Sequence, residues 1–195
     1  FMLFYYTGNS FFMDIDGIGN RQSTSPAVYA TGTGYIMDGI YDGTLASANR
    51  SKIYEEEVLR KTYTESSALV PDKPSPLNLG CTHNADSRPF GGYISEVIIY
   101  TVTVNDAQRI IVNNYLSSKY SIGLTANDKY AGDLPANGNY DFEVAGIGME
   151  SSGSNPTFSA SISGGITIAN TAGLDIGDYI LTGYASAANA QILYH

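Results

Sequence analysis

The sequence has no tryptophan, one cysteine and two histidines in 195 residues. A single cysteine, Cys81, excludes an internal disulfide, so the chain is not a disulfide-stapled scaffold. The histidines, His83 and His195, are too few and too far apart in the sequence to predict a zinc site. No apolar run approaches the roughly 18–20 residues of a membrane span, so we expect no membrane-spanning segment.

Positive charge is also scarce, with 10 Lys and Arg against 19 Asp and Glu and a net charge of -9. An acidic surface repels phosphate groups, so we expect no nucleic acid among the partners. Charged residues make up 15% and hydrophobic residues 43%, which leaves enough apolar material for a core and too little charge for disorder. The 21 glycines and 16 tyrosines are typical of a turn-rich β protein.

Short apolar runs between turn residues predict a chain built mainly of strands. The most strongly predicted strand is GGYISEVIIYT at residues 91–101, where β-branched and aromatic residues dominate. Residues 51–64 favour two short strands over a helix, in spite of their charge. The other predicted strands are 1–7, 10–16, 26–32, 34–41, 77–80, 141–148, 157–162, 164–169 and 178–184.

The segment after residue 104 predicts one amphipathic helix. Asn105 is a favoured N-cap, and Gln108 three residues later completes the pattern of a capping box. Gly123 is expected to end the helix. Because only one face is apolar, we expect that face to pack on the sheet that precedes the helix. The apolar stripe consists of Ile110, Ile111, Tyr115, Leu116 and Tyr120.

Residues 77–100 carry an ordered motif. LNLG at 77–80 is followed, after a loop, by F-x-G-x-I-x-E-V-x-x-Y from Phe90 to Tyr100. This order resembles the end of the laminin-G-like, or concanavalin A-like, jelly-roll modules of secreted bacterial proteins. Upstream, YIMDGIYDGT at 35–44 is similar to a strand of that family ending in Y-D-G-T. One departure is EEE at 55–57, which stands where the family has a Val-Asn-Gly hairpin turn.

The downstream half is similar to a more particular arrangement. AQRIIVNNYLSSKYSI at 107–122 resembles the helix that follows such a jelly roll in large secreted proteins of the Bacteroidetes type. EVAGIG at 143–148 resembles the D-I-A-G-I-G motif of the β module that comes next. Met149 and Glu150 then stand where the family has an arginine and an acidic residue. The resemblance covers roughly residues 35–184.

The resemblance implies a mainly β fold: an antiparallel β-sandwich of the jelly-roll type, incomplete at its N-terminus, with one amphipathic helix and a second small β module. The implied divisions are 1–104 for the jelly-roll part, 105–123 for a connecting helix packed on the sheet, and 124–195 for a truncated small β module. A complete jelly roll needs more chain than the roughly 100 residues before the helix. We therefore expect the missing strands to be supplied by another segment or chain.

One candidate metal site is DIDGIGN at residues 14–20. Asp14, Asp16 and Asn20 offer oxygen ligands for calcium, with a glycine between them for a tight bend. The alternative, a strand followed by an Asp-Gly turn, is favoured because the spacing of an EF-hand loop is absent. Two carboxylates that would join the site only if the fold brings them close are Asp38 and Asp42.

The acidic residues do not predict an enzyme. Concanavalin A-like glycosidases carry E-x-D-x-x-E on a strand, which sets the paired carboxylates, and this spacing is absent. The consecutive glutamates at 55–57 would alternate between the faces of a strand, and Glu96 stands alone on its strand. Cys81 and His83 have no orienting carboxylate at a recognised spacing, which favours a small buried cysteine over a nucleophile.

The tyrosines bear on a binding function. Exposed aromatic rings stack on sugar faces, and by resemblance the chain is a non-catalytic adhesion module of a secreted cell-surface protein that binds a glycan or a protein. Tyrosines equally fill the core of a tryptophan-free sandwich, so their number alone does not decide. Two alternatives stay open: a structural subunit of an extracellular fibre that uses strand donation, and an accessory domain of a glycan-cleaving enzyme.

Overall fold

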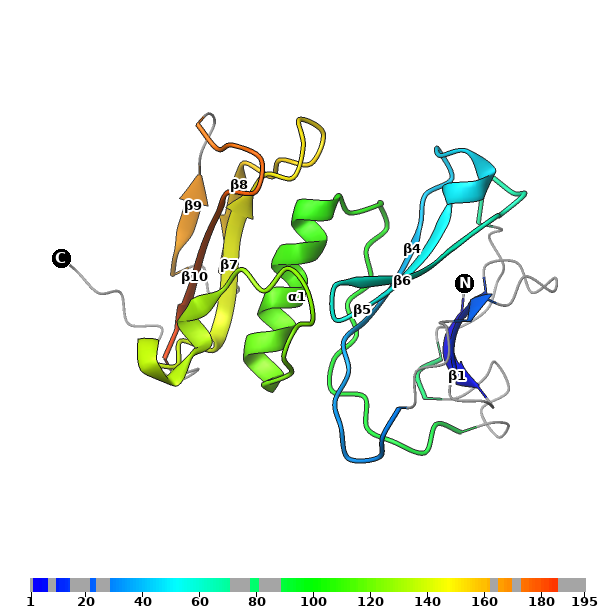
Figure 1. The fold of residues 1–195 in the computed structure, drawn as a ribbon, viewed down its shortest axis with the longest axis horizontal. Helices are drawn as coiled ribbons and strands as arrows, with labels where there is room; N and C mark the ends of the chain where they lie inside the picture. Colours follow the sequence, from blue (N-terminus) through cyan, green and yellow to red (C-terminus); the bar gives the residue numbers. More distant parts are fainter. Residues whose placement is uncertain are drawn as a thin grey trace. The chain divides into compact units, whose positions relative to one another are not determined.

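The computed structural model describes residues 2–6, 10–14, 22–23, 29–70, 78–80, 89–161, 165–169 and 173–185. These residues form mainly strands in antiparallel sheets, with one α-helix (Figure 1). This confirms the mainly β class with a single helix. The chain divides into two compact units, which are described separately. Unit 1 consists of Phe1–Thr31, Gly39–Ile53 and Leu59–Thr103, and unit 2 of Gly32–Asp38, Tyr54–Val58 and Val104–His195.

The first sheet lies in unit 1 and has three antiparallel strands in the order β1-β2-β3. Its strands are β1 (Met2–Tyr6), β2 (Ser10–Asp14) and β3 (Gln22–Ser23). Met13 on β2 is fully buried. The strands predicted at 1–7 and 10–16 are thus confirmed over residues 2–6 and 10–14.

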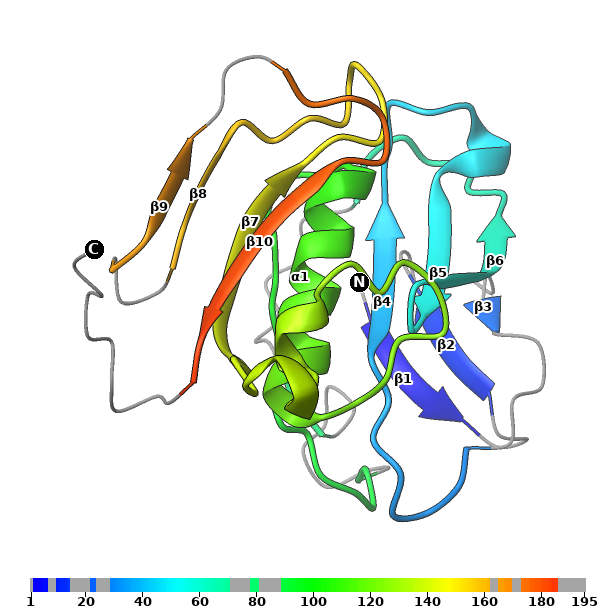
Figure 2. The ribbon, with the colours of Figure 1, turned by 60° about the vertical axis from the view of Figure 1, so that its left-hand side comes forward.

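A second three-stranded sheet has the order β4-β5-β6 (Figure 2). Its strands are β4 (Met37–Tyr41), β5 (Ser51–Glu55) and β6 (Val58–Tyr63), which confirms two short strands within 51–64. The turn between β5 and β6 consists of Glu56 and Glu57, with φ of 48° and 70°. A two-residue hairpin turn needs positive φ at such positions, which costs a non-glycine residue about 1–2 kcal/mol. The predicted alternation of these glutamates along a strand is therefore wrong for Glu56 and Glu57.

The helix α1 (Asp106–Tyr120) forms with the predicted capping box. The Gln108 backbone N–H donates to the Asn105 side chain, and the Asn105 N–H donates back to the Gln108 side chain, both at 2.9 Å. The helix ends earlier than predicted, because Ser121 adopts the left-handed conformation (φ 53°) and its N–H donates to carbonyls of the last turn. Gly123 lies beyond this cap.

In unit 2 the helix packs on an antiparallel pair of strands, β7 (Phe142–Gly148) and β10 (Tyr179–Tyr184) (Figure 2). The core between them contains Tyr115, Tyr130 and Val144, with Leu116 and Leu181 against it. Residues 36–38 and 54–57 lie in the same unit. The predicted division at residues 104 and 123 stays a prediction.

A smaller hairpin, β8 (Phe158–Ala160) and β9 (Thr167–Ala169), completes the strands of unit 2. All four strands predicted after residue 140 are thus confirmed, with shorter bounds. Short 3₁₀ turns among the described residues connect other elements, at Ser47–Asn49, Ala131–Asp133 and Pro135–Asn137.

Residues 91–101, the most strongly predicted strand, form no strand. Residues 78–80 and 29–32, within two other predicted strands, are also irregular. An isolated extended run makes no internal backbone hydrogen bonds, so high β-propensity becomes a strand only where a partner strand is available. None of the described strands is paired with residues 91–101. The described sheets also do not establish a closed sandwich.

Candidate functional site

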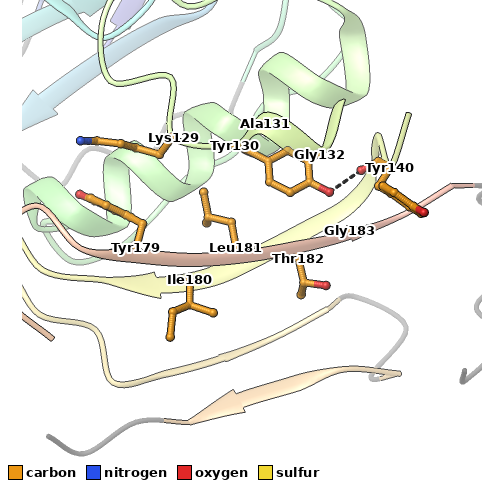
Figure 3. Close-up of a pocket in the computed structure, with 10 residues that line it drawn as sticks. All are labelled: Lys129, Tyr130, Ala131, Gly132, Tyr140, Tyr179, Ile180, Leu181, Thr182 and Gly183. Atoms are coloured by element: carbon orange, nitrogen blue, oxygen red, sulfur yellow. Dashed lines mark hydrogen bonds between the residues drawn. The ribbon is translucent and has the colours of Figure 1, made fainter. Parts of the chain in front are cut away.

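Unit 2 contains an open groove of about 630 Å³ beside β10 (Figure 3). One wall is the segment 129–132, and the other is β10 itself. Of the described residues that line it, three are tyrosines and one, Lys129, is charged. The lining residues are Lys129, Tyr130, Ala131, Gly132, Tyr140, Tyr179, Ile180, Leu181, Thr182 and Gly183.

The groove follows an edge of β10. Five consecutive residues of this strand line it, and consecutive strand residues point to opposite faces. Figure 3 shows Tyr179 and Leu181 on one side of β10, with Ile180 and Thr182 on the other. A space that reaches both faces must pass along the strand edge. Among the described strands β10 is hydrogen-bonded to β7 alone, so its second edge is open there.

Asn114 of the helix fixes the wall formed by residues 129–132. Its side-chain oxygen accepts hydrogen bonds from the backbone N–H groups of Lys129 (2.8 Å) and Tyr130 (2.9 Å). Its amide donates to the carbonyl oxygens of Ile110 (2.8 Å) and Asn127 (2.9 Å). With these four bonds the buried amide is fully satisfied, so this wall is held rigidly against the helix.

The tyrosine hydroxyls of the groove are fixed by hydrogen bonds. The Tyr130 hydroxyl donates to the Tyr140 carbonyl oxygen at 2.8 Å (Figure 3). The Tyr179 hydroxyl donates to Glu150 Oε1 at 2.8 Å, and the Lys129 ammonium lies 5.3 Å from the Tyr179 ring centroid. Burial raises the pKa of Tyr130 to about 12, and burial together with the Glu150 hydrogen bond raises the pKa of Tyr179. Both hydroxyls therefore stay protonated at neutral pH.

Apolar surface at the groove is accessible to a ligand. The Tyr140 residue is 42% exposed and Ile180 is 49% exposed. Tyr130 is buried, so it supports the wall instead of presenting its face. The sequence did not predict this groove, because its two walls are brought together by contacts between distant residues: Asn114 of the helix holds residues 129–132, and β7 pairs with β10. Tyrosine content was the one signal, and it does not identify which rings are exposed.

A second cluster of polar side chains is buried in unit 2 around Glu57, whose side chain is fully buried. Glu57 Oε2 accepts hydrogen bonds from Arg109 Nη1 and from Asn127 Nδ2, and Glu57 Oε1 accepts from Asn113 Nδ2 at 2.5 Å. The same Asn113 amide donates to Asp38 Oδ2 at 2.7 Å. The Arg109 guanidinium lies 3.9 Å from the Tyr54 ring centroid, in cation–π geometry.

This cluster fastens the left-handed β5–β6 turn to the helix, which offsets the backbone strain at Glu57. Two carboxylates share one amide, and only one of them is paired with Arg109. Burial raises the pKa of Asp38 to about 6, against the lowering effect of the Asn113 hydrogen bond. Within the described part of the chain, the buried atoms Arg109 Nε and Asn113 Oδ1 have no hydrogen-bond partner. Sequence analysis missed the cluster, because its members are separated by up to 89 positions.

Comparison with known proteins found no matching family model, curated protein or solved structure.

Of the three predicted calcium ligands, only Asp14 lies within the described residues. Asp14 is the last residue of β2, whereas Asp16 and Asn20 lie outside the described residues, so calcium binding stays a prediction. Asp38 belongs to the buried cluster, and Asp42 accepts a 2.9 Å hydrogen bond from the Thr44 N–H in a turn. The described residues contain no group of three or more His, Cys, Asp or Glu arranged for a metal ion.

Three other residues considered for chemistry, Cys81, His83 and His195, also lie outside the described residues. Among the described residues, no helix has the length and apolar character needed to cross a membrane. The expectation of no membrane-spanning helix is confirmed for that part of the chain.

Proposed function

We propose that the chain is a non-catalytic binding module and that the groove beside β10 binds a short, uncharged oligosaccharide. The observation that carries this proposal is the concave wall of tyrosines, with one accessible ring at Tyr140 and a lysine at its end. The volume of about 630 Å³ falls within the range of small-ligand sites.

The chemistry of the lining residues suits a sugar. Aromatic rings present flat apolar faces, which pack against the C–H face of a pyranose, and Tyr140 offers such a face. Lys129 and Thr182 supply a donor and a hydroxyl for the ligand's own hydroxyl groups. The net charge of -9 disfavours a strongly anionic glycan, so a neutral oligosaccharide is the preferred ligand.

The protonation of the tyrosines supports binding without chemistry. Tyr130 and Tyr179 hold their protons far above neutral pH, so neither serves as a base there. Among the described residues that line the groove there is no carboxylate, whereas glycoside hydrolysis uses two. By the resemblance stated above, we further propose that the strands of unit 1 belong to a jelly-roll sandwich of a secreted, cell-surface adhesion protein.

The test is binding of the chain to an array of neutral and acidic oligosaccharides, followed by titration calorimetry on the strongest ligand. Tyr140→Ala is expected to weaken binding about tenfold or more, because stacking on the ring is lost. Phe158→Ala is the matched control, since Phe158 is a 65% exposed ring of the same unit outside the groove. Binding that Tyr140→Ala leaves unchanged, or the absence of any binding oligosaccharide, would contradict the proposal.

A further inference from the structure

The loop of residues 131–140 contributes three of the described residues that line the groove. It contains two short 3₁₀ turns, Ala131–Asp133 and Pro135–Asn137, and the second turn leads into the pair Asn137-Gly138. Both members of this pair are exposed to solvent. Asparagine is a chemically labile residue, and the glycine that follows it has no side chain to shield its backbone nitrogen. The pair is therefore a candidate site of chemical modification.

The fold requires glycine at position 138. Its φ is 112°, in the left-handed region that other residues enter only with strain. A Cβ atom there would also lie 2.7 Å from Cε2 of the Tyr140 ring, closer than two carbon atoms pack. The residue that makes the Asn137 amide labile is thus the one that places Tyr140 at the groove.

The turn around Gly138 is weakly held. The Gly138 N–H donates to the Pro135 carbonyl oxygen at 3.4 Å, and the Asn139 N–H donates to the Leu134 carbonyl oxygen at 3.5 Å. Both distances exceed the usual range of about 2.7–3.2 Å, so these bonds contribute little. Local opening of an exposed turn of this kind costs little free energy, and it releases the Gly138 nitrogen from its hydrogen bond.

The Asn137 side chain holds the two 3₁₀ turns together. Its amide Nδ2 donates to the Ala131 carbonyl oxygen at 2.6 Å. The neighbouring Tyr140 N–H donates to the Gly132 carbonyl oxygen at 2.8 Å. Ala131, Gly132 and Tyr140 all line the groove, so the amide of Asn137 stabilises the groove wall directly.

We propose that Asn137 is a site of spontaneous deamidation that releases this part of the groove wall. In the opened turn the Gly138 nitrogen attacks Asn137 Cγ, so that a bond forms between these two atoms. The Cγ–Nδ2 bond breaks, and Nδ2 leaves as ammonia with the proton that the Gly138 nitrogen loses. Water then opens the resulting cyclic imide at either of its carbonyl carbons. The products are aspartate, or isoaspartate with the backbone routed through the side chain.

Either product is incompatible with the present loop. A carboxylate has no hydrogen to donate to the Ala131 carbonyl oxygen, and it places a negative oxygen where the amide nitrogen was. Residues 131–141 already contain Asp133 and Asp141 and no basic residue, so the new charge finds no cation within that segment. Isoaspartate also lengthens the backbone just before Tyr140. A weakened sugar affinity would rest on the proposed function, whereas the modification itself does not.

The first test follows the full chain by peptide mapping and mass spectrometry during storage at mildly alkaline pH. Asn137 is expected to convert to aspartate and isoaspartate about tenfold faster than Asn139, which lies in the same exposed turn but precedes tyrosine. Asn155 precedes proline, which has no N–H to lose, and it should stay unmodified. Asn137→Gln should abolish the modification at that position, while Asn139→Gln should leave the rate at Asn137 unchanged.

The second test measures the effect on the wall without waiting for the reaction. Asn137→Asp supplies one product directly, and hydrogen exchange of the Tyr140 N–H, which is bonded to Gly132, should become about fivefold faster or more. Asn139→Asp is the matched control, because it adds the same charge in the same turn without removing the bond to Ala131. Modification at Asn137 no faster than at Asn139, or equal exchange rates in the two aspartate variants, would overturn the proposal.

Discussion

Replacing Asp38 by asparagine tests the buried cluster through the pH dependence of stability. Asp38 accepts a hydrogen bond from Asn113 and faces the Glu57 carboxylate, and burial raises its pKa from 3.8 to about 6. A carboxyl whose pKa is higher in the folded state than in the unfolded chain favours folding when protonated. Its contribution is therefore fully present below pH 3.8 and is lost as the pH rises through about 6.

The size of the effect follows from the shift. One pKa unit corresponds to about 1.4 kcal/mol, so a shift of about two units makes the folded protein about 2–3 kcal/mol less stable at pH 7.5 than at pH 4. Asparagine keeps an oxygen for the Asn113 amide and carries no charge at either pH. Asp38→Asn is therefore expected to raise the free energy of unfolding by about 2 kcal/mol at pH 7.5 and to change it little at pH 4.

Urea unfolding followed by circular dichroism at a series of pH values measures the free energy of unfolding of the unaltered chain and of Asp38→Asn. Asp42→Asn is the control, because Asp42 accepts from Thr44 in a turn and takes no part in the cluster. The control should keep the pH dependence of the unaltered chain. An Asp38→Asn variant that is less stable at pH 7.5, or that keeps the full pH dependence, would refute this account of the cluster.

Two further changes probe other parts of unit 2. Arg109→Met should destabilise the chain by about 3–5 kcal/mol because it leaves the Glu57 carboxylate buried without its cation, and adding Glu57→Gln should restore part of that loss. Urea unfolding measures this double-mutant cycle, and strictly additive losses would show that the two groups are not coupled. Ser121→Gly should stabilise the chain by about 0.5–1 kcal/mol, because Ser121 holds φ at 53° in the helix C-cap. Thermal unfolding measures this change, and a lower midpoint would contradict the assignment of strain there.

Local features were the most predictable from the sequence. The capping box of Asn105 and Gln108 depends on residues three positions apart, so it formed as predicted. The strands of the C-terminal half were predicted for a similar reason, since glycine and turn residues bound each run. The strand predicted at 91–101 failed because forming it also requires a partner strand, which its own residues do not specify.

The sites depend on contacts between distant residues, which explains why the sequence did not reveal them. The sequence predicts Glu57 on a strand, but it lies in a turn whose positive φ directs its carboxylate toward Arg109 and Asn113. The groove likewise requires residues 129–132, which Asn114 of the helix holds, to lie beside β10. The composition indicates that tyrosines could contribute to binding, but packing in the fold determines which tyrosine rings are exposed.

The four hydrogen bonds of Asn114 make one side-chain amide common to the helix and to the groove wall. A ligand that presses on Lys129 or Tyr130 alters the electronic surroundings of that amide without touching it. Its two NH₂ proton resonances, shielded from water and slow to exchange, therefore serve as a built-in spectroscopic reporter of occupancy. Hydrogen-exchange protection of the backbone amides in the helical turn at Ile110 should increase as these two resonances shift.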